Sequence, residues 1–200
     1  MENHKSATVY GSVFALCLVA GLLFLVDNAW SKESVLDKKF KPLGIITLAG
    51  IAPPTGYGLV DMDKNQVVLS DFSGKIVVLT FWTTWCPDCV NEMPDIEKLH
   101  KKLGNNDVII LGVDLKESEK KVKKFITQHN LTFKILLDEK GEMGRAFGIR
   151  SIPTTFILNK KGGLIGKAMG ARHWDSKKFV DLFEYLIKTD SKESDLRDIQ

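Results

Sequence analysis

The sequence predicts an α/β domain in which helices cover both faces of a mixed central sheet. The first observation is that short apolar runs alternate with amphipathic helical patterns between residues 76 and 147. Such alternation is typical of parallel strands joined by helices. The second observation is a hairpin pattern around residues 160–163, followed by a last amphipathic stretch at 175–187. Because the hairpin adds antiparallel strands, the predicted sheet is mixed.

The chain has 200 residues, which suits one domain of about 150 residues with additional segments. Its formal charge is +3, from 28 Lys and Arg against 25 Asp and Glu. Since charges of both signs are interspersed, they indicate neither nucleic-acid binding nor a polybasic membrane contact. Cys17 lies in an apolar N-terminal segment, which leaves Cys86 and Cys89 in the rest of the chain. Two cysteines exclude a disulfide-rich framework.

Residues 7–26 contain no charged side chain and follow a short polar head at residues 1–6. A helix of this length covers roughly 30 Å, about one hydrocarbon core. We therefore expect a transmembrane signal anchor. A cleaved signal peptide and a buried soluble helix are the alternatives.

The remaining elements follow from apolar periodicity and from turn residues. Residues 27–50 form a charged linker with a short strand near its end, and residues 51–188 form the domain. A β-hairpin is expected where two β-prone runs flank Asp63-Lys64-Asn65. Strands are expected at residues 76–82, 108–113, 133–137, 154–158 and 164–169, and helices after Cys89 and at 118–129, 142–147 and 175–187. Residues 189–200 are a polar tail that we expect to be disordered.

Two cysteines stand where the apolar run 76–82 passes into a helical pattern. After Cys89, apolar residues recur at three-residue steps, as on one face of a helix. Cys86 is therefore expected at the helix start, where unpaired backbone N–H groups and the positive end of the dipole lower a thiol pKa. Cys89, one turn further, is close enough to form a disulfide with it. A Cys-x-x-Cys at such a junction is typical of a redox dithiol.

Four other roles are open to the cysteine pair. A zinc site needs about four ligands, and no second cysteine pair or close histidine supplies them. A structural disulfide across two residues closes too small a loop to stabilise much. Thr83 precedes Cys86 by three residues, as in thiol peroxidases, but the proline those enzymes carry four residues earlier is Leu79 here. A copper chaperone is the alternative from another class; Met93 is near but lies on the apolar face of the helix.

Four patterns occur in a fixed order: Ala52-Pro53, LSDFSGK at residues 69–75, FWTTWCPDC at 81–89 and IPTTF at 152–156. Together they resemble the membrane-anchored TlpA/ResA-like thiol-disulfide oxidoreductases of the thioredoxin superfamily, over residues 51–187. The resemblance implies a thioredoxin fold with an N-terminal β-hairpin extension and a central insertion. It also implies that Pro153 is cis and lies beside the dithiol, where an extended substrate can pair. A trans proline opening an edge strand is the ordinary alternative.

The expected reaction is thiol-disulfide exchange. Cys86 as thiolate attacks a substrate disulfide, and Cys89 resolves the mixed disulfide. The resemblance implies that Trp85, Ile152 and Pro153 form the substrate-binding surface.

Two residues between the cysteines, Pro87 and Asp88, are expected to tune the redox potential. The negative charge of Asp88 opposes a thiolate. Because a less stable thiolate gives up electrons more readily, Asp88 favours a reductant.

Glu92 stands three residues after Cys89, one helical turn on. Its position resembles that of an acidic residue near the dithiol of TlpA/ResA-like proteins. Thioredoxins proper carry a buried aspartate six residues before the first cysteine, where this chain has Thr80. We therefore expect Glu92 to accept or supply the proton of Cys89. A solvated helix carboxylate is the alternative.

The resemblance also implies partners: a disulfide-containing client, for example in cytochrome c maturation, and a membrane thiol reductant of the CcdA/DsbD type. We expect a monomer held to the bacterial cytoplasmic membrane by its N-terminal helix, with no nucleic acid, metal or cofactor. Flanking charges alone, Lys5 before the span against Lys32, Lys38, Lys39 and Lys41 after it, would keep the domain inside. A thiol redox domain suits an oxidising space, however, so we expect a periplasmic domain.

Overall fold

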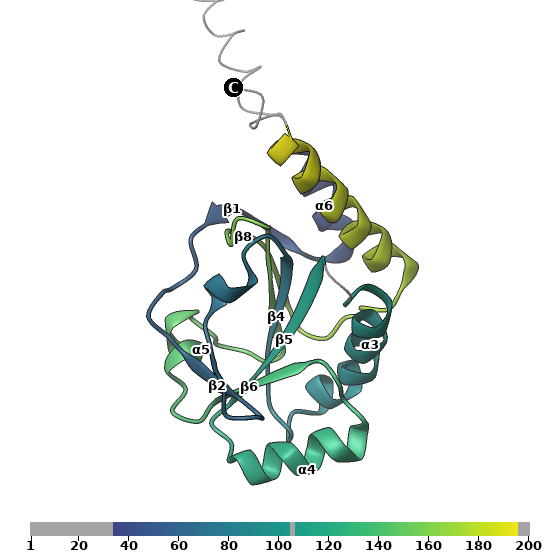
Figure 1. Ribbon diagram of the computed structural model, residues 1–200. Coiled ribbons are helices and arrows are strands. Elements are labelled where there is room, and N and C mark those ends of the chain that lie inside the picture. Colours follow the sequence, from purple (N-terminus) through teal and green to yellow (C-terminus); the bar gives the residue numbers. More distant parts are fainter. Residues whose placement is uncertain (1–33, 105–106, 196–200) are drawn as a thin grey trace, which may run out of the picture. The chain divides into compact units, whose positions relative to one another are not determined.

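The computed structural model describes residues 34–104 and 107–195 of the chain (Figure 1). The expected head, the membrane segment 7–26 and the first part of the linker lie outside these residues, as do residues 196–200. Within the described ranges, no helix is both long and apolar enough to cross a membrane. The chain divides into two compact units, Met1–Lys38 and Lys39–Gln200, and the sheet belongs to the second.

Eight strands of the described residues form one mixed sheet in the order β1-β8-β7-β4-β5-β6-β2-β3. They are β1 (Ile46–Ile51), β2 (Leu59–Asp61), β3 (Gln66–Val67), β4 (Ile76–Trp82), β5 (Val108–Leu115), β6 (Lys134–Asp138), β7 (Thr154–Leu158) and β8 (Leu164–Met169). β4, β5 and β6 are parallel, and the other neighbours pair antiparallel. The helices are α2 (Val35–Phe40), α3 (Pro87–Leu103), α4 (Glu119–His129), α5 (Glu142–Ala146) and α6 (Lys177–Asp195), with short 3-10 turns η1 (Lys41–Leu43) and η2 (Leu69–Phe72). This architecture confirms the predicted fold class.

Two elements are longer than the sequence pattern indicates. β5 continues past Val113 because Asp114, although polar, is still paired with β4 on one side and β6 on the other. α6 ends at Asp195 rather than at Ile187, and the residues beyond Ile187 are all polar, so they add no apolar stripe that the sequence pattern could show. The expected hairpin forms β2 and β3, and β2 pairs with β6 at that side of the sheet.

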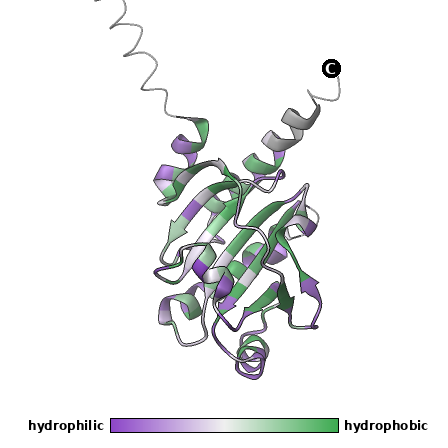
Figure 2. Cartoon of the chain, turned by 90° about the vertical axis from the view of Figure 1, so that its left-hand side faces the viewer, coloured by the Kyte–Doolittle hydropathy of each residue, from purple (hydrophilic) through white to green (hydrophobic). Residues whose placement is uncertain are grey.

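Consecutive residues at the end of β4 show how both faces of the sheet are covered. The Phe81 ring lies 5.2 Å from that of Phe147, directly after α5. Trp82 points to the opposite face, as successive strand residues do, and lies 5.2 Å from Phe125 of α4. Figure 1 shows α5 and α3 on opposite sides of the sheet, and Figure 2 shows that the central strands are apolar. The side chains of Phe81 and Trp82 are fully buried. Their packing fixes the point where the chain turns toward the cysteines.

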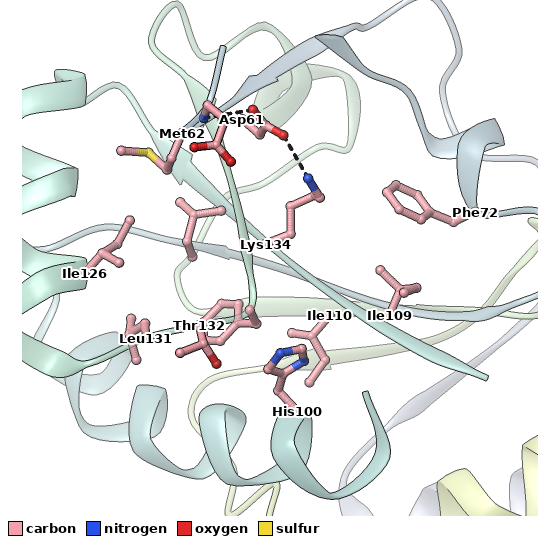
Figure 3. A pocket seen from close by; sticks show the side chains of 13 residues that line it. Asp61, Met62, Phe72, His100, Ile109, Ile110, Ile126, Leu131, Thr132 and Lys134 are labelled. Carbon is pink, nitrogen blue, oxygen red and sulfur yellow. Dashed lines mark hydrogen bonds and ion pairs between the residues drawn. The ribbon is translucent and has the colours of Figure 1, made fainter. Parts of the chain in front are cut away.

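A pocket of about 410 Å³ lies by the first residues of β5 (Figure 3). The turn that leads from β4 to the cysteines lies at the opposite end of the sheet strands. One dashed line in Figure 3 joins Lys134 to Asp61, and Nζ of Lys134 donates to Oδ2 of Asp61 at 2.8 Å. The backbone N–H groups of Asp63 and Asn65 donate to Oδ1 of the same carboxylate. The hydrogen bond from Lys134 lowers the pKa of Asp61 to about 2, although burial opposes the change.

Replacing Lys134 with methionine is expected to lower the free energy of unfolding by about 1 kcal/mol at pH 7, since Lys134 is partly exposed and screened by solvent. The pKa of Asp61 is depressed in the folded state, so the stabilisation is present above about pH 4. It is lost as the pH falls toward 2, and the two proteins should then converge in urea unfolding. The control is Lys64→Met. It removes an exposed ion pair, in which Nζ of Lys64 lies 3.9 Å from Oε2 of Glu119, and it should change the free energy of unfolding little. A Lys134→Met deficit that persists unchanged at pH 2 would contradict the assignment.

Candidate active site

Cys86 ends the turn after β4 and is the N-cap residue of α3. Pro87 follows at the first helical position, where a backbone N–H has no intrahelical partner in any case. The N–H of Cys89 donates to Sγ of Cys86 at 3.2 Å, so the sulfur takes the place of a capping oxygen. The predicted placement of Cys86 at the helix start is confirmed.

Cys86 and Cys89 form a disulfide with a Cα–Cα distance of 5.2 Å. Cys86 is 5% exposed, whereas Cys89 is completely buried. Pro87 and Asp88 between them are exposed. Of the two sulfurs, that of Cys86 is therefore the one that a second protein can reach.

The loop before β7 lies against Cys86. The peptide bond between Ile152 and Pro153 is cis, as predicted. The carbonyl oxygen of Ile152 lies 3.8 Å from Sγ of Cys86. Trp85, directly before Cys86 in the chain, is 64% exposed. A hollow of about 270 Å³ is lined by Trp85 and Ile152, together with Thr83, Leu115, Lys116 and Arg145 among others.

Glu92 lies on the buried face of α3, one turn after Cys89, and is 2% exposed. Its Oε2 accepts hydrogen bonds from the backbone N–H of Arg172 at 3.1 Å and from Nε1 of Trp174 at 3.2 Å. Its Oε1 has no hydrogen-bond partner among the residues that the structure describes. Burial, only partly offset by these hydrogen bonds, raises the pKa of Glu92 to about 7. Glu92 is not a solvated helix carboxylate, and it can hold or release a proton near neutral pH.

Thr80 occupies the position where thioredoxins proper carry their buried aspartate. It is completely buried, and its Oγ1 lies 3.0 Å from Oγ1 of Thr155 on β7. A pair of hydroxyl groups therefore replaces a titratable group at this point of the core.

The sequence pattern did not indicate the partners of Glu92. Arg172 and Trp174 follow β8 and stand 80 and 82 residues away in the chain. One available signal was Trp174 itself, because a tryptophan in a polar loop is usually buried with its N–H bonded to an acceptor. The sequence pattern also missed Glu117, which accepts hydrogen bonds from Thr84 in the turn before Cys86.

A dithiol at a helix N-terminus, beside a cis-proline loop on a mixed sheet, defines a thiol-disulfide oxidoreductase with a thioredoxin-like fold. Residues 52–166 match the AhpC/TSA family. The chain is 36% identical over 132 residues to the thiol-disulfide oxidoreductase ResA of Bacillus thuringiensis subsp. konkukian, a match covering 66% of this chain and 73% of that protein. It is 34% identical over 135 residues to ResA of Halalkalibacterium halodurans, covering 68% and 75%.

A solved structure, that of StoA from Bacillus subtilis, superposes with a TM-score of 0.56 at 29% identity and covers 67% of this chain and 98% of that one. The chain therefore belongs to the AhpC/TSA family, and it is a thiol-disulfide oxidoreductase homologous to ResA.

Proposed function

We propose that the protein reduces disulfide bonds of client proteins outside the cytoplasm, with Cys86 as the nucleophile and Cys89 as the resolving thiol. The observation that carries the proposal is the cysteine pair at the start of α3, with Sγ of Cys86 next to the Ile152 carbonyl oxygen. The Cys86 thiolate attacks one sulfur of the client disulfide, whose S–S bond breaks, and the other client sulfur leaves and takes up a proton.

In the second step Cys89 loses its proton and attacks Sγ of Cys86. The mixed disulfide breaks, the second client sulfur leaves as a thiol, and the Cys86–Cys89 disulfide forms. Two electrons have then passed from the protein to the client. A membrane thiol reductant must return them before another cycle.

Glu92 takes up the proton that Cys89 loses. Its burial and its pKa of about 7 support this role, because a base works best when its pKa lies near the working pH. Glu92 lies one helical turn from Cys89, so the two side chains project from the same side of α3. Arg172 and Trp174 fix the orientation of its carboxylate.

The client binds beside the dithiol at Trp85, Ile152 and Pro153. Trp85 supplies exposed apolar surface, and the adjoining hollow can receive a side chain next to the client cysteine. Because Pro153 has no N–H, backbone pairing with an extended client segment would run through the neighbouring residues.

The residues between the cysteines favour a reductant. Pro87 fixes the first helical position, and the carboxylate of Asp88 in the first turn opposes a thiolate at Cys86. The effect is small because Asp88 is exposed and its charge is screened.

The proposed site of action is the outer face of a bacterial cytoplasmic membrane, with residues 7–26 as anchor. The uncharged length of that segment supports it. A reductant of the CcdA/DsbD type would supply electrons, and an apocytochrome with a cysteine pair is a fitting client.

Trapping of the client tests the proposal. The full chain with Cys89→Ser is expected to hold its client as a mixed disulfide on Cys86, released by dithiothreitol. Cys86→Ser removes the same disulfide and is the matched control, which should trap nothing. Equal trapping by both variants, or by neither, would contradict the exchange role.

Copper titration of the reduced protein separates exchange from a copper chaperone. Exchange predicts catalysed insulin reduction that stays dependent on Cys86. Tight copper binding without insulin reduction would favour the chaperone, for which a two-sulfur site is chemically suited.

A further inference from the structure

A second cluster of carboxyl groups lies beneath the turn that leads into Cys86. Thr84, two residues before Cys86, donates its backbone N–H to Oε2 of Glu117 at 2.5 Å and its hydroxyl to Oε1 at 2.9 Å. Nζ of Lys121 lies 2.5 Å from Oε1 of the same carboxylate. Glu117 therefore ties the turn before the nucleophile to the segment between β5 and α4.

Asp114, next to this cluster at the end of β5, is completely buried. Among residues 34–104 and 107–195, neither of its carboxyl oxygens has a partner at ordinary hydrogen-bond geometry, and only the backbone N–H of Glu117 acts on the carboxyl group as a weak donor. Its neighbours across the sheet are Trp82 of β4 and Leu137 of β6. A buried carboxylate with no well-formed hydrogen bond, beside a second carboxylate, is strongly unfavourable, and a proton on one of the pair relieves it.

We propose that Asp114 is a positioning residue for the exchange reaction: it carries a proton and donates a hydrogen bond to the carboxylate of Glu117, which in turn holds Thr84 and the turn that presents Cys86. With this donor, Glu117 is bound by Asp114, Lys121 and Thr84 together. The inference deepens the proposed function, because it concerns how Cys86 is presented for attack.

The electrostatics agree on which residue holds the proton. Burial, together with the side-chain hydrogen bond and the charge of Glu117, raises the pKa of Asp114 to about 8, although the backbone N–H of Glu117 and the charge of Lys121 oppose the change. Burial acts to raise the pKa of Glu117 as well, but hydrogen bonds from Lys121, Thr84 and Asp114 lower it on balance. The charged groups that act on Asp114 are Glu117, from the segment after β5, and Lys121 of α4. Its neighbours Trp82 and Leu137 carry no charge.

A pH dependence follows. When the pH rises through about 8, Asp114 loses its proton and repels Glu117, so the hold on Thr84 weakens. Asparagine is isosteric and donates through its amide at every pH. Asp114→Asn should therefore keep the arrangement without the titration, whereas Asp114→Ala removes the donor.

The test compares insulin reduction by the full chain and its variants from pH 6 to 9.5. At pH 7, Asp114→Asn should stay within about twofold of the unaltered chain and Asp114→Ala should be about tenfold slower. Above pH 8 the rate of the unaltered protein divided by that of Asp114→Asn should fall severalfold. Taking this ratio cancels the titration of the thiols, which both proteins share. The NMR amide resonance of Thr84 should titrate near pH 8 in the unaltered protein and not in Asp114→Asn.

Asp138 of β6 is a matched control, because it is also buried but accepts hydrogen bonds from the N–H groups of Glu142 and Gly144. Asp138→Asn should lower the free energy of unfolding, and the ratio of the rate of the unaltered protein to that of Asp138→Asn should stay constant from pH 7 to pH 9.5. A Thr84 resonance that does not titrate, or a constant ratio of unaltered protein to Asp114→Asn, would overturn the inference. The proposed function would instead fail through insulin reduction that is independent of Cys86, so the two failures are distinguishable.

Discussion

Cys86→Ser is expected to lower the rate of insulin reduction by at least about 10³-fold, because a serine hydroxyl is not ionised at neutral pH and cannot attack a disulfide. Cys89→Ser should also fail to turn over, but it should still form the mixed disulfide with one client sulfur in a single turnover. The measurement is a stopped-flow comparison of the first step and the complete cycle.

The two serine variants control for one another. Each removes the same disulfide from the same helix start, so a kinetic difference between them reports the position of the remaining sulfur rather than the loss of the disulfide. A first step as fast in Cys86→Ser as in Cys89→Ser would contradict the assignment of the nucleophile.

Glu92→Gln is expected to slow insulin reduction at pH 7 by about tenfold or more, because general acid-base groups contribute at least this much. The glutamine oxygen can still accept from Arg172 and Trp174, so the local contacts survive. The slowing should therefore arise from the missing proton acceptor, and the step in the pH–rate profile near pH 7 should disappear.

The same change should stabilise the fold. The pKa of Glu92 is raised from 4.5 to about 7, so the folded state loses stability as the pH rises through that interval. Glutamine does not ionise, and Glu92→Gln should gain about 2–3 kcal/mol at pH 8 and nothing at pH 4, measured by urea unfolding.

Glu97 is a control of opposite sign on the same helix. It is also buried, but its carboxylate accepts two hydrogen bonds from Thr132 and pairs with Lys101. Burial opposes these contacts, yet they lower the pKa of Glu97 on balance. Glu97→Gln should destabilise the protein at pH 7 and leave exchange unchanged. If Glu92→Gln behaved in the same way, the acid-base role of Glu92 would be wrong.

Local patterns made the central part of the fold predictable. The apolar run of β4 has the predicted bounds, and the helix start at Cys86 follows from the apolar face of α3 and from Pro87. The resemblance added the cis bond before Pro153, which periodicity alone does not indicate.

Contacts between distant segments were not predictable in this way. The surroundings of Glu92 depend on Trp174, and those of Asp114 depend on a pairing of three strands. Neither set of contacts produces a periodic pattern of apolar residues in the sequence near the cysteines. The environment of an acid, and hence its pKa, is set by the tertiary packing rather than by its place in a motif.

Alkylation of the reduced protein tests the central claim most directly. Brief exposure to iodoacetamide over a range of pH, with peptide mass spectrometry, measures how fast each sulfur reacts. We predict that Cys86 is modified first, and at a lower pH than an ordinary thiol, while Cys89 is protected by burial. Faster modification of Cys89, or equal rates at both sulfurs, would contradict the account.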